Sequence, residues 1–141
     1  MRILLALFLF LIPNFASAEL HEVEMLNRNE TGSMVYSPNF LRISSGDSVR
    51  FLATRPGHNA ASIDCMIPDG ATPFKGKINE EIEITFSIPG LYGIKCTPHF
   101  AMGMVMLIQV GPTPALPHNL PAELPSRARD RLLAYIAELS E

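Results

Sequence analysis

Between residues 19 and 110 the chain alternates hydrophobic and polar positions with a period of two, in short runs separated by turn residues. Successive side chains of a strand point to opposite faces, so this alternation predicts strands that bury one face. The clearest runs are Val23/Met25, Leu41/Ile43, Val49/Phe51/Ala53, Ile82/Ile84/Phe86 and Tyr92/Ile94/Cys96. Residues 104–110 are apolar almost throughout, as in a central strand. The spacing predicts an all-β, antiparallel sandwich or barrel.

Residues 55–80 interrupt this pattern. Pro56-Gly57, Pro68-Asp69-Gly70 and Pro73 are turn signals, which indicate a long connection between strands. No amphipathic run long enough for a helix lies between the strands, and this excludes an alternating βαβ architecture.

The composition changes after Val110. Residues 112–125 contain five prolines, which indicate a linker or turns and leave open whether a helix forms there. Ser126 is a suitable N-cap for a helix running to about Leu139. Its apolar stripe, which we expect to pack on the sandwich, comprises Ala128, Leu132, Leu133, Ile136 and Leu139. We interpret the arginines at 127, 129 and 131 as a solvated face. The predicted domain spans residues 19–111, followed by the proline-rich connection and helix at 112–141.

The first 18 residues have the pattern of a secretory signal peptide. Arg2 precedes an apolar run over residues 3–12, and Ala16-Ser17-Ala18 supplies small residues before a predicted cleavage site after Ala18. Ten apolar residues would rise about 15 Å as a helix, half of a ~30 Å hydrocarbon core, which disfavours a membrane anchor. We therefore expect an exported protein, located in the periplasm and not inserted in the membrane once the signal is removed.

Charge and size exclude several classes. With 141 residues the chain suits one domain, and 11 basic against 14 acidic residues give a net charge of −3. Nucleic-acid binders are usually basic, so we expect no nucleic-acid partner. Two cysteines are too few for a disulfide framework.

One short segment collects three potential metal donors. Cys96, His99 and Met104 follow the spacing Cys-x2-His-x4-Met on a loop between two predicted strands, and His58 lies on a turn elsewhere. Two imidazoles, a thiolate and a thioether are the donor set of a blue-copper centre: a trigonal plane with a weak axial bond. This set leaves no open position for a substrate, so it predicts electron transfer rather than metal catalysis.

Other interpretations of these residues remain chemically possible. Zinc accepts imidazole and thiolate, although a thioether is a poor zinc ligand. A Cys65–Cys96 disulfide is possible in an exported protein, but it would leave the spacing of His99 and Met104 unexplained. We interpret His21 and His118 as ordinary hydrogen-bonded polar groups.

Four segments together resemble the pseudoazurins, periplasmic cupredoxins of bacteria. They are Gly57-His58-Asn59, residues 66–70, residues 77–80 and residues 92–104. The resemblance covers nearly all of the chain after the signal peptide. It implies a cupredoxin-like Greek-key β-sandwich of about eight strands with a C-terminal helical extension. It also implies one type 1 copper per chain, cycling between Cu(I) and Cu(II), with ligands His58, Cys96, His99 and Met104.

The resemblance also implies roles for three neighbouring residues. The backbone N–H of Asn59 would donate to the Cys96 sulfur, Pro98 would stiffen the ligand loop, and Met34 would contact the exposed imidazole of His99. Cys65 departs from the family pattern and has no assigned role.

The implied function is that of a one-electron carrier, not an enzyme. The expected partners are periplasmic redox proteins such as a copper nitrite reductase or a c-type cytochrome, and we expect a monomer. A basic rim of Arg55, Lys75, Lys77 and Lys95 would steer the carrier toward an acidic partner. The alternative is a periplasmic copper-binding or delivery protein, which would exchange its metal readily.

Overall fold

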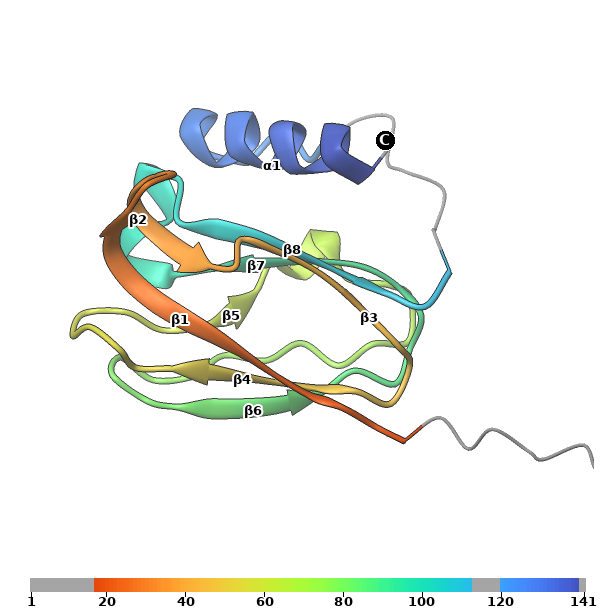
Figure 1. Ribbon diagram of the computed structural model, residues 1–141. Coiled ribbons are helices and arrows are strands. Elements are labelled where there is room, and N and C mark those ends of the chain that lie inside the picture. Colours follow the sequence, from red (N-terminus) through yellow and green to blue (C-terminus); the bar gives the residue numbers. More distant parts are fainter. Residues whose placement is uncertain (1–16, 113–119, 140–141) are drawn as a thin grey trace, which may run out of the picture.

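The computed structural model describes residues 17–112 and 120–139, in which two four-stranded sheets pack face to face beneath one long helix (Figure 1). The first sheet has the order β2-β1-β4-β6 and the second β3-β8-β7-β5. The predicted signal peptide lies almost wholly outside the described residues, as do positions 113–119 of the proline-rich connection, including His118. The strands are β1 (Leu20–Asn29), β2 (Gly32–Ser37), β3 (Phe40–Ile43), β4 (Ser48–Leu52), β5 (Ala61–Ser62), β6 (Ile82–Thr85), β7 (Gly90–Lys95) and β8 (Val105–Val110).

The alternating positions are buried as the sequence pattern predicts. Val23, Met25, Val49 and Phe51 have no exposed surface and lie between the sheets. All six residues of β8 are buried, because this strand faces the sandwich core on one side and the helix on the other. The prediction of a β-sandwich is therefore confirmed.

The prediction that the strands are antiparallel is wrong for two pairs. Strand β1 runs parallel to β4, with Leu20 opposite Ser48, and β3 runs parallel to β8, with Phe40 opposite Leu107. The other four pairs are antiparallel. The chain crosses between the sheets before and after β3, which places strands beside partners distant in sequence. Side-chain alternation reports which face is buried but not which strand lies alongside.

Two strands were not predicted. The apolar positions 34–36 of β2 are consecutive rather than alternating, and β5 is only two residues long within the irregular region 55–80. That region also contains a short 3₁₀ turn, η1 (Asp64–Met66).

Helix α1 (Ser126–Leu139) covers the outer face of the second sheet, as expected for an amphipathic helix. Its buried residues are Ala128, Leu132, Tyr135 and Leu139. The first three of these belong to one hydrophobic cluster with Val105 and Leu107 of β8. The predicted stripe is wrong at Leu133, which is 50% exposed. The buried face runs through Leu132 and Tyr135, about one helical turn apart, and Leu133 lies about 100° around the helix from Leu132. No helix in the described part of the chain is both long and apolar enough to span a membrane.

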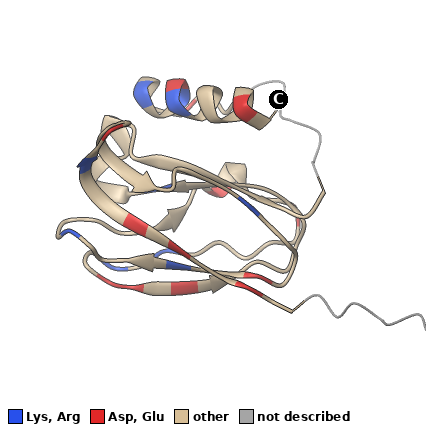
Figure 2. Cartoon of the chain, viewed as in Figure 1, with Lys and Arg blue, Asp and Glu red and all other residues tan. Residues whose placement is uncertain are grey.

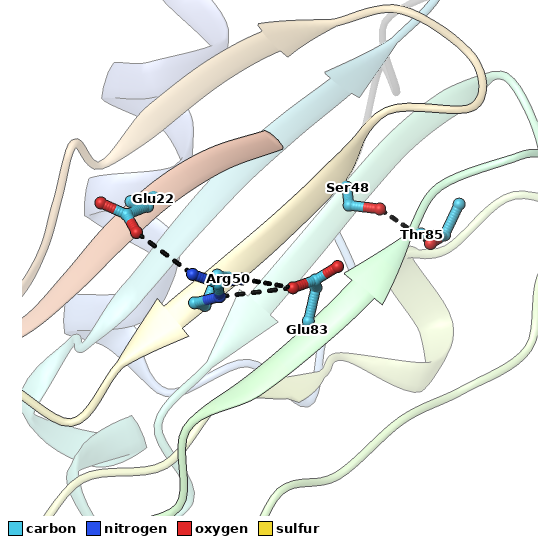
Figure 3. A network of polar contacts seen from close by, with 5 residues as sticks. All are labelled: Glu22, Ser48, Arg50, Glu83 and Thr85. Atoms are coloured by element: carbon cyan, nitrogen blue, oxygen red, sulfur yellow. Dashed lines mark hydrogen bonds and ion pairs between the residues drawn. The ribbon is translucent and has the colours of Figure 1, made fainter. Parts of the chain in front are cut away.

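The outer face of the first sheet is polar. Arg50 of β4 lies between Glu22 of β1 and Glu83 of β6, at 3.5 and 2.9 Å, and Ser48 bonds to Thr85 beside them (Figure 3). Acidic residues are spread along β1 and β6, whereas basic residues gather at the start of α1 (Figure 2). Exposed ion pairs such as those of Arg50 with Glu22 and Glu83 contribute only about 0–1 kcal/mol each. This face is therefore a solvated surface, and the chemistry lies at one end of the sandwich.

Candidate metal centre

The loop between β7 and β8 carries three of the four expected donors. It contains the 3₁₀ segment η2 (Thr97–Met102), and its own backbone closes it. The Cys96 N–H donates to the Met104 carbonyl at 3.0 Å, while the Met104 N–H donates to the His99 carbonyl at 3.1 Å. Gly103 ends η2 with φ +86°, a left-handed conformation that favours glycine. The first and last donors of the motif therefore lie side by side.

Three donor atoms converge at the end of the sandwich. The Nδ1 atoms of His58 and His99 are 3.0 Å apart, and the Cys96 sulfur lies 3.7 and 3.5 Å from them. Around an ion with metal–nitrogen and metal–sulfur bonds of about 2.0 and 2.3 Å, planar trigonal donors would be separated by about 3.5–3.7 Å. The observed spacings are within about half an ångström of these values, so the residues fit a metal ion.

His58 is fixed by a residue that the sequence did not single out. Its Nε2–H donates to the side-chain oxygen of Asn27, on β1, at 2.7 Å. This bond selects the tautomer whose Nδ1 lone pair faces the other donors. The backbone of His58 is held too, because its carbonyl accepts from the Asn79 N–H at 2.8 Å. Nothing in the local sequence marks Asn27, which lies 31 residues before its partner.

Asn59 joins the two donor-bearing segments. Its side-chain oxygen accepts from the Thr97 N–H at 2.7 Å, and its amide nitrogen donates to the Gly76 carbonyl at 2.9 Å and to the Thr97 hydroxyl at 3.1 Å. Its backbone N–H bonds to the Cys96 thiol, and its carbonyl accepts from the Tyr36 hydroxyl at 2.8 Å. Asn59, the residue after His58, therefore positions Thr97, the residue after Cys96.

Burial favours the uncharged forms of the titratable groups in this cluster. Burial raises the pKa of the Cys96 thiol, although backbone N–H groups of Asn59 and His99 work in the opposite direction. Burial lowers the pKa of the His58 imidazole, and His99 lowers it further. The pKa of Tyr36 lies well above its ordinary value because of burial and the neighbouring thiol. Neutral imidazoles offer free lone pairs, and a bound cation would supply the charge that stabilises a thiolate.

The remaining predicted residues surround this cluster. Met104 is fully buried, Pro98 is exposed within η2, and His99 is partly exposed. Met34 is half-buried against the core and has φ +52°, unusual for a residue with a side chain.

The interpretation of the arginines at 127, 129 and 131 as a solvated face is wrong for Arg131. One guanidinium nitrogen of Arg131 donates to the carbonyls of Met34 and Gly103 at 2.8 and 2.7 Å. Its other terminal nitrogen donates to the Ser33 carbonyl at 2.8 Å. Arg131 therefore ties the helix to the residue before Met104 and to strand β2. The sequence pattern does not predict these contacts, because every residue carries a backbone carbonyl and none is distinguished as an acceptor.

A disulfide does not account for the cysteines. Both are free thiols, and Cys96 is buried while Cys65 is exposed on η1. The Cys65–Cys96 alternative is therefore wrong.

Two facing β-sheets with a buried thiol–imidazole cluster at one end define the cupredoxin class. The family described as copper binding proteins, plastocyanin/azurin family, matches residues 23–111. The pseudoazurin of Paracoccus pantotrophus is 46% identical over 136 residues, covering 96% of this chain and 92% of that protein. The native pseudoazurin structure from Hyphomicrobium denitrificans superposes with a TM-score of 0.78 at 38% identity, covering 84% of this chain and 97% of that one. The pseudoazurin structure from Methylobacterium extorquens gives 0.72 at 39% identity, covering 83% and 98%.

The chain belongs to the plastocyanin/azurin family of copper-binding proteins, and within it to the pseudoazurins. It is therefore a blue copper electron carrier rather than an enzyme, and its cofactor is copper. His58, Cys96, His99 and Met104 form the donor pattern of a type 1 copper site.

Proposed function

We propose that this carrier would hold copper through His58, Cys96, His99 and Met104, and that it donates electrons to a copper nitrite reductase or a similar redox enzyme. The observation that carries the ligand assignment is the convergence of the two imidazoles and the thiol, whose donor atoms all lie within 4.8 Å of one another. Bound copper would supply a one-electron couple between Cu(I) and Cu(II). The chain itself holds the donors in a geometry that need change little when the electron moves.

The surface around His99 is suited to brief docking. Pro98, Ala101 and Met102, which belong to the same 3₁₀ segment as the partly exposed His99, are exposed and carry no charge. Small contacts of this kind are typical of transient redox encounters.

A basic margin would steer the encounter. Lys75 and Lys77 line a surface pocket with Asn59 and Thr97, next to the donor segments. Lys95 lies over the Phe100 ring, 5.2 Å from its centroid. These cations favour a partner with an acidic face, such as a copper nitrite reductase or a c-type cytochrome. The rate of association should then fall as salt is added.

We also propose that residues 1–18 direct export to the periplasm and are removed after Ala18. Ser17 and Ala18 are exposed and precede the first strand, so the bond after Ala18 is accessible. The folded unit would then be residues 19–111, with residues 112–141 supplying the connection and the packed helix. Burial of His58, Cys96 and Met104 disfavours the alternative of a copper-delivery protein, which needs ready metal exchange.

The visible spectrum of the oxidised holoprotein tests the ligand assignment. We expect an intense thiolate-to-copper band that is lost in Cys96→Ser and kept in Cys65→Ser, which removes the exposed thiol. A colourless, redox-silent protein would contradict the assignment.

Turnover with a copper nitrite reductase tests the partner. We expect reduction of nitrite that depends on the carrier and slows with ionic strength. Copper transfer to an apo-protein that outpaces electron self-exchange would instead favour the delivery alternative.

A further inference from the structure

The first residues of β1 have a feature that the electron carrier does not use. Cleavage after Ala18 would leave Glu19-Leu20-His21 at the start of the chain, with a free α-amine on Glu19 and histidine in the third position. A chain beginning in this way can present four nitrogens in one plane: the amine, the two following backbone amides and the imidazole Nδ1. Tetragonal nitrogen sites of this type select Cu(II) or Ni(II).

The structure places these groups at an accessible point. Residues 17–20 are exposed, and His21 is partly exposed. Asp47, which is buried, accepts from the Glu19 nitrogen at 2.8 Å and from the His21 Nε2–H at 3.1 Å. The carboxylate thus engages Nε2 and leaves Nδ1 as the ring nitrogen with the lone pair. Carboxylates orient metal-binding histidines through their second nitrogen in the same way.

Binding would require the end of β1 to leave its partner strand. Leu20 lies opposite Ser48 and His21 opposite Val49, and the Ser48 N–H donates to the Glu19 carbonyl at 2.9 Å. Terminal pairs open at little cost in free energy. The strand remains paired with β4 through Glu24 and with β2 through Asn29, so the sandwich would stay intact.

We propose that the mature chain carries a second metal site, formed by the α-amine of Glu19, the backbone nitrogens of Leu20 and His21, and Nδ1 of His21. The proposal rests on the proposed cleavage after Ala18 but not on electron transfer. Binding of one divalent ion displaces the two amide protons and one proton of the terminal ammonium group. All four ligands are nitrogens, so the site favours Cu(II) over the softer Cu(I).

The site lies far from the thiol–imidazole cluster. Asn27, the partner of His58, lies seven positions after Leu20 in β1, which corresponds to about 23 Å of strand. In Figure 1 the start of β1 and the η2 loop occupy opposite ends of the sandwich. The two sites would therefore bind independently, and each can be removed without the other.

Nickel titration of the exported holoprotein tests the proposal. The type 1 copper is first reduced, because Cu(I) is colourless, and the intact mass establishes the first residue. We expect one equivalent of Ni(II) to give a yellow, diamagnetic, square-planar complex. A matched control carries one extra glycine before Glu19, which moves His21 to the fourth position and leaves the side chains of Glu19, His21 and Asp47 in place. The band should be lost in this control and in His21→Asn.

Two results would overturn the proposal. Equal nickel binding by the native and glycine-extended chains would assign the ion to side chains. If the mature chain begins at a residue other than Glu19, the α-amine does not lie two residues before His21, and the proposed site cannot form. Neither result would change the blue colour of the oxidised protein. Failure of the second metal site can therefore be distinguished from failure of the proposed electron carrier.

Discussion

The two segments that meet at the metal centre are held in different ways. The Cys96–Met104 loop is closed by its own backbone, through bonds between Cys96, His99 and Met104. His58 instead depends on side chains from elsewhere, because Asn27 holds its ring and Asn59 ties its segment to Thr97. A local segment can be recognised from its spacing, whereas support from distant residues appears only in the fold. Substitutions that cut one kind of support and spare the other test this contrast.

The largest effect is expected at Asn59. Asn59→Ala removes three side-chain hydrogen bonds in a buried position and leaves the Thr97 N–H and the Gly76 carbonyl without this partner. We expect the free energy of unfolding to fall by about 2–4 kcal/mol, measured by urea denaturation of the metal-free protein.

Asn29→Ala is the matched control, because the Asn29 side chain bonds only to Thr31, in an exposed turn, among the contacts described. Its cost should stay below about 1 kcal/mol. Equal losses in the two variants would contradict the bridging role of Asn59.

The next effect is expected at Arg131. Arg131→Met removes three bonds to backbone carbonyls and should cost about 2–3 kcal/mol. Because one of those carbonyls belongs to Gly103, the visible spectrum of the copper protein should also shift. Arg127→Met, which changes an exposed residue of the same helix, should change stability by less than about 0.5 kcal/mol. A loss of stability with an unchanged spectrum would limit Arg131 to holding the helix.

Asn27 separates metal binding from stability. Asn27→Ala frees Nε2 of His58, and loss of such a partner costs about 10–100-fold in metal affinity. Asn27 is exposed, so the unfolding energy of the metal-free protein should hardly change. Competition with a copper chelator measures the affinity, with Arg28→Ala as the neighbouring control. Unchanged affinity would show that Asn27 does not orient the ring.

The smallest effect is expected within the ligand loop itself. Ala101 is exposed, and the loop around it is closed by backbone bonds. Ala101→Ser should change stability by less than about 0.5 kcal/mol and leave the copper spectrum unchanged. A clear change in either would mean that side chains, and not the backbone alone, shape this loop.

The sequence allowed the sandwich, the C-terminal helix and the convergence of His58 with Cys96 and His99 to be predicted. Each rests on a periodicity or on a recognised spacing. The parallel pairing of β1 with β4 and the inward turn of Arg131 were not predicted, because both are decided by residues distant in the chain. The place of Tyr135 in the buried stripe was missed for a related reason: a phenol suits either face of a helix until its neighbours are known. The signal peptide stays a prediction.

The bond from Arg131 to the Gly103 carbonyl joins residues 28 positions apart, with the arginine nearer the end of the chain. During synthesis the donor loop therefore leaves the ribosome before the residue that anchors it. A chain cut short before α1 would carry every donor atom and lack this anchor. The donor loop can therefore gain this support only after α1 has been made.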